Sequence, residues 1–508
     1  MLNLCTGATL GLLMAAEPSQ GAIIAFNRFG LGARAGDLPK VGSDPRGFLK
    51  AELQPDRALV TPDRAEGAGL AGTTANIQAA FAAEKARRRL REQMKAEAAQ
   101  PAPATASMGA PPATAPDPSM AQVGPVAPPV DRPKAQQPQP EGRIYRAEGL
   151  ARFGMARDAE IGFVERLVAF WSNHFCVSAG KSEILRASAG SFEREAIRPY
   201  VLGGFAEMLL AVERHPAMLF YLDNAQSVGP ASRAGQNRKR GLNENLAREI
   251  MELHTLGVDG GYTQGDVTSL ARVITGWTFA GREGRMGEPG TFLFNANMHE
   301  PGDQTVVGRA YLGGGFGQGE AALNDIAQHP ATARHLATKL VRHFIADAPP
   351  PAAVDKIAAV FRSRDGDLRA VSTALVDLPE AWSAPPTKIR NPYEFLVAAA
   401  RMLGATPADP GPMLNGLRTL GQPLWEPPGP NGHPDTAADW ASPEGMKLRL
   451  DVSAGVAQSY RGGGDPLALV EAAAGAALSP ETRDAISRAE SRQQGLALAL
   501  MAPEFQRR

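Results

Sequence analysis

The stretch NENLAREIMELHTLGVDGGYTQGDV, residues 243–267, carries the pattern that decides the fold. Leu246, Ile250 and Leu253 recur at spacings of four and three, so on a helix they share one face that should point into the core. The remaining positions are rich in charged and amide side chains, as in a helix with one buried face. The pattern predicts an amphipathic helix over residues 243–256.

The end of this helix and the start of the next are also marked. Gly257 stands where a helix commonly ends in a left-handed cap. Thr263, followed three residues later by Asp266, is typical of a capping box at the start of a helix. Downstream, burial is expected at four positions with helical spacing: Val267, Leu270, Ala271 and Ile274. The stretch therefore predicts two helices joined by a tight turn.

The same helical period continues outward along the chain. IGFVERLVAFWSNHF (161–175) has apolar residues at three and four spacing, and HPATARHLATKLVRHF (329–344) places a proline where it suits the first helical turn. Alternation of period two is scarce, although the Gly-rich stretch 276–311 is consistent with a small β-hairpin. We expect a mainly α fold: a multi-helical globular core interrupted by a long disordered Pro/Ala-rich insertion.

Composition narrows the class of protein. The chain has 508 residues, 53 basic and 53 acidic side chains, and 44% hydrophobic residues, which is typical of a soluble globular protein with more than one core-bearing unit. The balanced charge gives no global reason to bind nucleic acid. The two cysteines, Cys5 and Cys176, cannot build a disulfide framework or a thiolate zinc site.

The domain boundaries follow a compositional shift. From Pro101 to Pro140 the chain consists largely of Pro, Ala, Gln and Gly and has no aromatic residue, so it cannot bury enough apolar surface to order itself. Residues 82–100, just before it, predict a solvated helix. We expect four parts: an N-terminal helical part of the core (1–61), a solvated helix with the disordered insertion (62–143), a main helical domain (144–400) and a C-terminal helical segment (401–508).

The first twenty residues contain a short apolar run. It lacks the basic residues that precede a secretory core, because the first Lys or Arg is Arg28, and it is too short to span a bilayer. A buried first helix and a cytoplasmic location are favoured, with export as the alternative. No transmembrane anchor is expected elsewhere.

The polar face of the first helix has two interpretations. Glu244, Arg248 and Glu252 are spaced to form a ladder of exposed ion pairs. Alternatively, Asn245, Glu249 and Glu252 face a polar cleft, as oxygen ligands of a divalent metal or as an acid and base pair. His254 falls nearly opposite the carboxylates and cannot join them from an undistorted helix.

The histidines are placed in recognisable contexts. His215 and His329 each precede a proline and suit helix-capping positions. His174, beside Asn173 at the end of an amphipathic helix, is either a buried hydrogen-bonded histidine or part of a pocket. A basic stripe follows later in the chain, at His335, Lys339, Arg342 and His343. It favours a solvated face, and its alternative is a phosphate or carboxylate site.

Signatures of common cofactors are missing. The glycine-rich GGGFGQGE (313–320) follows no recognisable strand and carries no Walker lysine, and no flavin or other nucleotide signature is found. The chain also has no Gly-x-Ser-x-Gly nucleophile elbow and no His-Glu-x-x-His zinc helix. A divalent metal is the one cofactor that the acidic face could take.

Several long motifs, in order, resemble a large bacterial family catalogued as domain of unknown function 1800. They are NRFGLGARAGDL (27–38), RLVAFWSNHFCVSAGK (166–181), EREAIRP (193–199), HPAMLFYLDN (215–224), residues 241–267, ARVITGWT (271–278), residues 329–344 and LGQPLWEPPGPNGHPD (420–435). The resemblance covers nearly the whole chain. One departure is His433, where the family pattern implies a tryptophan, which puts a shared stacking role in doubt.

The resemblance implies a partner but no reaction. Members are often encoded beside proteins resembling exported sulfatases and alkaline phosphatases. The first hypothesis is therefore a non-catalytic helical protein that binds or matures such a partner. The second is a hydrolase, with or without a divalent metal, whose catalytic candidates are His174, Glu249, Glu252 and His254, and whose binding candidates are Asn173, Asn243, Asn245, Arg248 and Asp266. Glu249 and Glu252 are the metal candidates.

Overall fold

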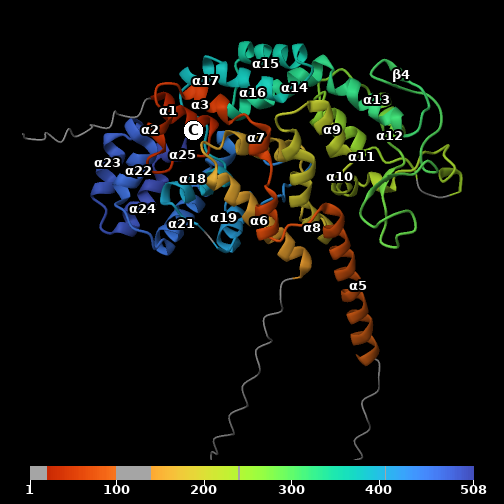
Figure 1. Ribbon diagram of the computed structural model, residues 1–508, viewed down its shortest axis with the longest axis horizontal. Coiled ribbons are helices and arrows are strands. Elements are labelled where there is room, and N and C mark those ends of the chain that lie inside the picture. The colour runs from red at the N-terminus through yellow and green to blue at the C-terminus, as the bar shows by residue number, and fades with distance from the viewer. Residues whose placement is uncertain (1–19, 99–138, 238–240, 407) are drawn as a thin grey trace, which may run out of the picture.

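The computed structural model describes residues 20–98, 139–237, 241–406 and 408–508. Two predictions lie outside these residues: the buried first helix, and the disordered insertion apart from its last two positions, Gln139 and Pro140. Within the described residues the prediction of a mainly α fold is confirmed. Figure 1 shows helices throughout, with strands only near one end of the molecule.

The elements of the first half are named here in chain order, with η marking 3₁₀ and π turns. They are α1 (Gln20–Ile24), η1 (Ala25–Phe29), α2 (Asp37–Val41), α3 (Pro45–Glu52), η2 (Pro55–Ala58), α4 (Pro62–Gly67), α5 (Thr73–Ala98), α6 (Pro140–Asp158), α7 (Phe163–His174), α8 (Glu183–Phe192), η3 (Glu193–Ile197), η4 (Arg198–Tyr200), α9 (Phe205–Glu213), α10 (Pro216–Tyr221), η5 (Asn224–Gln226), η6 (Gly235–Asn237), α11 (Asn245–Glu249), η7 (Ile250–His254) and α12 (Gln264–Val273).

The second half begins with four short strands and then returns to helices. Its elements are β1 (Trp277–Phe279), β2 (Phe292–Phe294), β3 (Gln304–Val306), β4 (Arg309–Tyr311), α13 (Phe316–Ala327), α14 (Pro330–Phe344), α15 (Pro351–Ser363), α16 (Leu368–Asp377), α17 (Glu380–Ser383), α18 (Pro392–Leu403), α19 (Gly411–Thr419), α20 (Ala437–Trp440), α21 (Pro443–Ser459), α22 (Pro466–Ala474), η8 (Gly475–Ala477), α23 (Pro480–Ser487), α24 (Arg492–Met501) and α25 (Pro503–Gln506).

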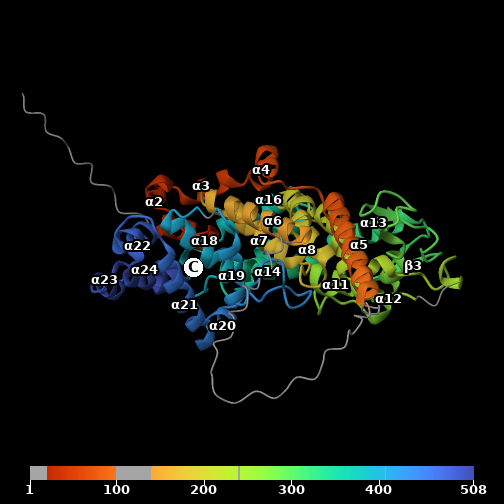
Figure 2. The same ribbon diagram turned by 90° about the horizontal axis from the view of Figure 1, so that it is seen from below.

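The two ends of the described chain lie side by side. Figures 1 and 2 show α2 beside α22, and α1 and α2 contact η8 and α22, respectively. At the far end of the molecule, α12 and α13 lie beside the two sheets. One cluster of buried apolar side chains extends from Ala22 to Phe505. In the described residues, no helix combines the length and apolar character needed to cross a membrane.

The stretch 243–267 folds as two helices, with one distortion. Leu246 and Ile250 are buried as predicted, but the helix widens into the π turn η7, which adds one residue to that turn. The buried face therefore shifts from Leu253, which is partly exposed, to His254, which is 1% exposed. Gly257 has a φ of +84°, which confirms the left-handed cap. Both hydrogen bonds of the predicted capping box are present.

The predicted hairpin is confirmed, and a second one follows it. β1 pairs antiparallel with β2, with Thr278 opposite Leu293, and β3 pairs antiparallel with β4, with Thr305 opposite Ala310. The aromatic residues of β1 and β2 cover one side of α13, where the rings of Trp277 and Phe316 lie 5.4 Å apart. These sheets are small appendages of a helical core.

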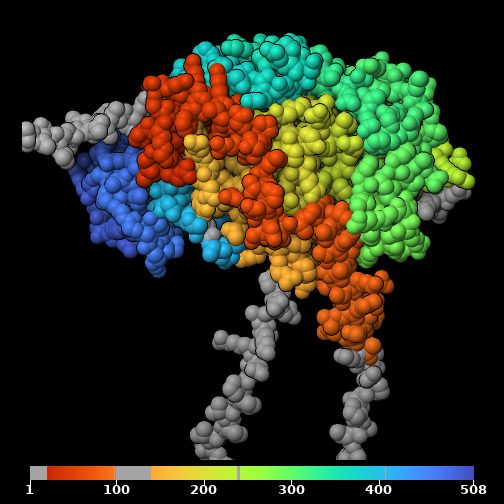
Figure 3. Space-filling model, in the orientation of Figure 1, coloured from red at the N-terminus to blue at the C-terminus, as the bar shows by residue number. Residues whose placement is uncertain are grey.

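Helix α5 only partly matches the solvated helix predicted for residues 82–100. It begins nine residues earlier, at Thr73, and its first half is buried at Asn76, Ile77 and Ala80, where it packs against α8. The second half projects from the body, as Figures 1 and 3 show, and exposes Leu90 and Met94. The prediction of a solvated helix is therefore wrong at Ala83, which is buried. The preceding residue, Ala82, is exposed as predicted.

Two buried charged side chains fix the turn between α6 and α7. The Glu52 carboxylate accepts hydrogen bonds from the backbone N–H groups of residues 161–163, the longest at 3.2 Å, and so occupies the N-terminus of α7. Arg401, from α18, donates to the carbonyls of Ala156, Arg157, Ala159 and Glu160 at the end of α6. Helix α7 is therefore held in place at its start, and its far end opens into a pocket.

Candidate functional site

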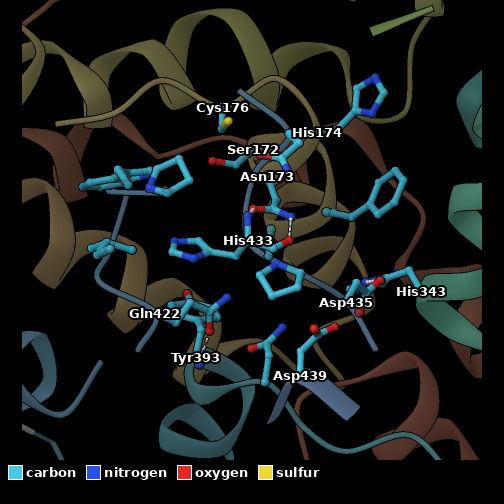
Figure 4. Close-up of a pocket in the computed structure, with 18 of the residues that line it drawn as sticks. Ser172, Asn173, His174, Cys176, His343, Tyr393, Gln422, His433, Asp435 and Asp439 are labelled. Atoms are coloured by element: carbon cyan, nitrogen blue, oxygen red, sulfur yellow. Dashed lines mark hydrogen bonds and ion pairs between the residues drawn. The ribbon is translucent and has the colours of Figure 1, made fainter. Parts of the chain in front are cut away.

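A pocket of about 340 Å³ lies where three helices meet one long loop. Its walls are the end of α7, the last turns of α14, the start of α18 and residues 422–439, which run from the end of α19 into α20. Figure 4 shows Asn173 and His433 near its centre, with Asp435 and His343 on one side and Tyr393 and Gln422 on another. The volume suits a small metabolite.

The long loop is bound to the end of α7 by reciprocal hydrogen bonds. Asn173 Nδ2 donates to the His433 carbonyl at 2.9 Å, and the His433 N–H donates to Asn173 Oδ1 at 2.8 Å (Figure 4). The Cys176 thiol donates to the carbonyl of Pro430 at 3.2 Å. Gly432, at a φ of +80°, passes so close to Asn173 that a Cβ would lie 2.5 Å from its carbonyl oxygen. Glycine is therefore required there.

Trp425 closes another wall in a strained conformation. Its φ of +48° is uncommon for a bulky residue and indicates that its surroundings hold it in place. Its indole N–H donates to Glu193 Oε2 at 3.0 Å. The guanidinium of Arg152 lies over the rings of both Trp425 and Tyr393 and pairs with Glu193 at 3.0 Å. Arg152 therefore already has a carboxylate partner.

The side chains around Asp435, on the acidic side of the pocket, also have hydrogen-bond or ion-pair partners. His343 Nδ1 donates to Asp435 Oδ2 at 2.8 Å, and its Nε2 accepts from Arg166 at 3.1 Å. Arg166 in turn pairs with Glu394 at 3.2 Å. Burial would raise the pKa of the Asp435 carboxyl, but His343, Lys388 and Arg508 hold it well below its usual range. Burial lowers the pKa of His343 to about 4, so its imidazole is neutral at pH 7.

Lys339 and Arg342 are the cations of the pocket that lack an acidic partner. Among the described residues the Lys339 ammonium has no hydrogen bond and no ion pair, and Arg342 donates only to the Asp347 carbonyl, at 3.4 Å. Burial lowers the pKa of Lys339 to about 8, although the nearby Asp435 acts in the opposite direction. Burial of an unpaired charge is costly, so an anion bound beside the partly buried Lys339 would stabilise its ammonium form.

This finding corrects the expectation of a solvated basic stripe on α14. Lys339, Arg342 and His343 line the pocket, and His343 is buried. His335 is partly buried and its Nε2 donates to the Leu253 carbonyl at 3.1 Å. The stripe faces inward because residues 422–439 cover this side of α14, which the periodicity of α14 alone does not reveal.

The predicted site residues fall into two groups. Asn173 and His174 line the pocket, and His254 lies directly behind His174, whose Nε2 donates to the His254 carbonyl at 3.1 Å. The imidazole of His174 is directed away from His433 in Figure 4, and its buried Nδ1 has no partner in the part of the chain that the structure describes. His254 Nδ1 donates to Glu213 Oε1 at 2.8 Å, deep in the core.

The other candidates lie outside the pocket wall. Arg248 forms the predicted ladder with Glu244 and Glu252, at 3.4 and 3.2 Å. Asn243 accepts from the N–H of Asn245, and Asp266 serves the capping box and also accepts from the Val307 N–H. Over residues 20–98, 139–237, 241–406 and 408–508, no three His, Cys, Asp or Glu side chains gather as ligands for a metal ion.

Glu249 differs from its neighbours on the helix. It is partly buried, and within the described segments its carboxylate makes no hydrogen bond and no ion pair. Burial raises its pKa, and Glu252 adds to that shift while His254 and Arg248 oppose it. Glu249 therefore has no protein partner among the described residues, but it does not line the pocket.

Trp425 and Asp435 were not among the predicted site residues, and Lys339 was named only in the basic stripe, whose alternative was a phosphate or carboxylate site. Two separate features of the sequence were available as signals. Residues 329–344 have charged residues at helical spacing, and residues 420–435 are rich in Pro and Gly and lack a regular period. Nothing in the spacing says that these two segments meet, because they lie roughly 90 residues apart in the chain.

Comparison with known proteins gives one match. Neither the curated proteins nor the solved structures contain a chain similar to this one. The family model described as "Protein of unknown function (DUF1800)" matches residues 24–507, which includes every wall of the pocket. This protein belongs to the DUF1800 family.

Proposed function

We propose that this protein binds a small anionic molecule in the pocket between α7, α14 and residues 422–439. The single observation that carries the proposal is Lys339, an ammonium group in the pocket wall that forms no ion pair with a carboxylate of the described residues. A bound carboxylate, phosphate or sulfate would supply the missing counter-ion. The proposal belongs to the binding class of hypothesis.

The neighbouring acidic side chains already have other partners within the protein, which supports an external ligand for Lys339. Asp435 is held by His343 at 2.8 Å and also approached by Lys388 and Arg508. Asp439 accepts from the hydroxyl and the N–H of Thr436 as part of a capping box. Both acids therefore have other partners, and neither forms an ion pair with Lys339.

Arg342 provides the second contact for the same ligand. It lies three residues after Lys339, so the two side chains leave the same face of α14 as neighbours. A guanidinium can hold a carboxylate or phosphate through two parallel hydrogen bonds. The apolar walls at Phe170 and Trp425 reduce competition from water and so strengthen both contacts.

Titration calorimetry with sulfate, phosphate and a series of small carboxylates tests the proposal. We expect Lys339→Met to weaken binding of the preferred anion by about tenfold or more, since a hydrogen bond to a charged group contributes roughly 1.5–3 kcal/mol. Arg334→Met is the matched control: it removes a cation from the same helix, but one that is exposed and paired with Asp355. Equal affinity in wild-type and Lys339→Met protein would overturn the proposal.

A second candidate function is binding or maturation of a sulfatase-like partner. The observation that favours it is the projecting half of α5, where Leu90 and Met94 are 57% and 60% exposed and lie one turn apart. The double variant Leu90→Glu with Met94→Glu should then abolish co-purification with a sulfatase-like protein that is expressed together with this chain. Co-purification that survives the double variant would remove α5 from this role.

The hydrolase hypothesis stays a prediction. Of the residues it gathers, Asn173 and His174 line the pocket, whereas Asn243, Glu249, Glu252 and Asp266 do not. Glu249→Gln remains its direct test, because loss of an activity without loss of the fold would restore the acidic face as a site.

A further inference from the structure

Lys339 differs from the other buried lysine near the pocket. Lys388 Nζ meets Asp347 Oδ1 at 2.5 Å and the Asp435 carbonyl at 2.8 Å, so its charge is compensated on two sides. Lys339 has no such contacts, although it lines an enclosed space with Phe170, Cys176 and Val177. A structural lysine would be expected to resemble Lys388. Lys339 instead lines the pocket without an ion-pair partner among the described residues.

We propose that Lys339 forms an imine with the carbonyl carbon of a small oxo acid whose carboxylate is bound by Arg342. This inference rests on the proposed function and specifies its ligand: an anion that carries an aldehyde or ketone beside the carboxylate. The two groups of such a ligand are a few ångströms apart. Lys339 and Arg342 are three residues apart on α14, so their side chains are neighbours on one face of the helix and both line the pocket.

The chemistry balances without any added redox agent. The nitrogen lone pair of the neutral amine attacks the carbonyl carbon, and a proton moves from nitrogen to oxygen to give a carbinolamine. Loss of one water, formed from the hydroxyl and a second proton, leaves the C=N bond. Overall, one amine and one carbonyl give one imine and one water. The apolar walls favour the dehydrated product.

A usable fraction of Lys339 is in the reactive form. With a pKa of about 8, roughly a tenth of the side chain is neutral at pH 7, whereas for an ordinary lysine the fraction is on the order of one in a thousand or less. The neighbouring thiol does not compete. Burial raises the pKa of Cys176 to about 12, and its proton is directed at backbone carbonyls.

Reductive trapping tests the imine directly. The full chain is incubated with pyruvate or glyoxylate and sodium cyanoborohydride, then analysed by intact mass and peptide mapping. We expect one adduct per chain, on Lys339, and none on Lys388. Lys339→Arg keeps a positive charge but has no primary amine, so it should lose the adduct. Arg342→Met should slow trapping at low oxo-acid concentration, by about tenfold or more.

Lactate separates failure of this inference from failure of the proposed function, since it has the carboxylate without the carbonyl. If calorimetry shows lactate or sulfate binding that depends on Lys339, but no adduct forms, the imine is overturned and anion binding stands. If no anion binds and no adduct forms, both proposals fail. Adducts spread evenly over exposed lysines, or retained in Lys339→Arg, would also overturn the imine. Thermal unfolding of both variants confirms that each is folded.

Discussion

A single methyl group separates glycine from alanine, and at Gly257 the structure has no room for it. A Cβ there would lie 2.7 Å from His335 Nδ1, and the φ of +84° is also unfavourable for any other residue. Gly257→Ala should therefore lower the free energy of unfolding by about 1–2 kcal/mol from the backbone alone, plus a cost for displacing the imidazole. Urea denaturation measures the change.

Gly261 provides the control for that substitution. It has the same φ of +84°, but nothing lies within 4 Å of where its Cβ would be. Gly261→Ala should therefore show the backbone cost without the contact with His335. Equal losses in the two variants would mean that His335 moves aside freely and does not constrain the helix end.

Glu213 and His254 form a buried pair that holds η7 against α9. Their side chains are 0% and 1% exposed, and Oε1 and Nδ1 lie 2.8 Å apart. Glu213→Leu should lower the free energy of unfolding by roughly 3 kcal/mol or more, because it leaves a buried donor without an acceptor. Glu213→Gln should cost less, since its amide oxygen can still accept. Chemical denaturation that finds the two variants equally stable would contradict this account.

The sequence alone could not predict this pair. His254 was recognisable as a histidine at the end of an acidic helix, but its partner lies 41 residues away on α9. The same holds for Asn173 and His433, which are 260 residues apart. Periodicity and capping signals describe neighbours along the chain, so they predicted which residues are buried and where helices end, but not which polar groups meet.

At the scale of elements, the capping box of α12 has a second contact that its sequence pattern does not show. Thr263 Oγ1 accepts from the Asp266 N–H, while the Asp266 carboxylate accepts from Thr263 and also from the Val307 N–H at 2.7 Å. Thr263→Ala should cost about 1 kcal/mol, the usual effect of losing a cap. Asp266→Ala should cost clearly more, because it also releases the β3–β4 turn. Thermal or urea unfolding of both variants decides this.

Local signals predicted the elements well where they depend on neighbours along the chain. His215 and His329 occupy capping positions as expected, each accepting from the second N–H after it, at 3.2 Å. The π turn η7 was missed because the sequence fits an ordinary helix equally well and only the packing of His254 against Glu213 and Phe175 favours the wider turn. Only one wall of the pocket, at Asn173 and His174, had a signal in the sequence, because the opposite wall, residues 422–439, has no regular period.

At the scale of the whole molecule, burial keeps several histidines neutral. It lowers the pKa values of His335, His343 and His433 to about 4, against about 6.5 in an unfolded chain. Between these values the unfolded state binds more protons than the folded state. The free energy of unfolding therefore rises with pH in this window, and it falls as pH decreases from about 6.5 to about 4.

Each such histidine contributes a slope of up to about 1.4 kcal/mol per pH unit within that window and none above it. Carboxyl groups with a lowered pKa, such as Asp435, act only at lower pH, as they titrate below the unfolded value of about 4.

Urea denaturation at three pH values measures this dependence. The midpoint concentrations of urea at pH 8 and 6.5 should be similar, and the midpoint at pH 5 should be clearly lower. In His433→Gln the free energy of unfolding should decrease less steeply between pH 6.5 and 5, because unfolding then takes up about one proton fewer. The imidazole of His433 lies in the pocket wall, with its Nε2 near the Pro423 carbonyl. A variant with the wild-type slope would show that His433 is protonated in the folded protein without penalty, and that the loop 422–439 opens to solvent before the core unfolds.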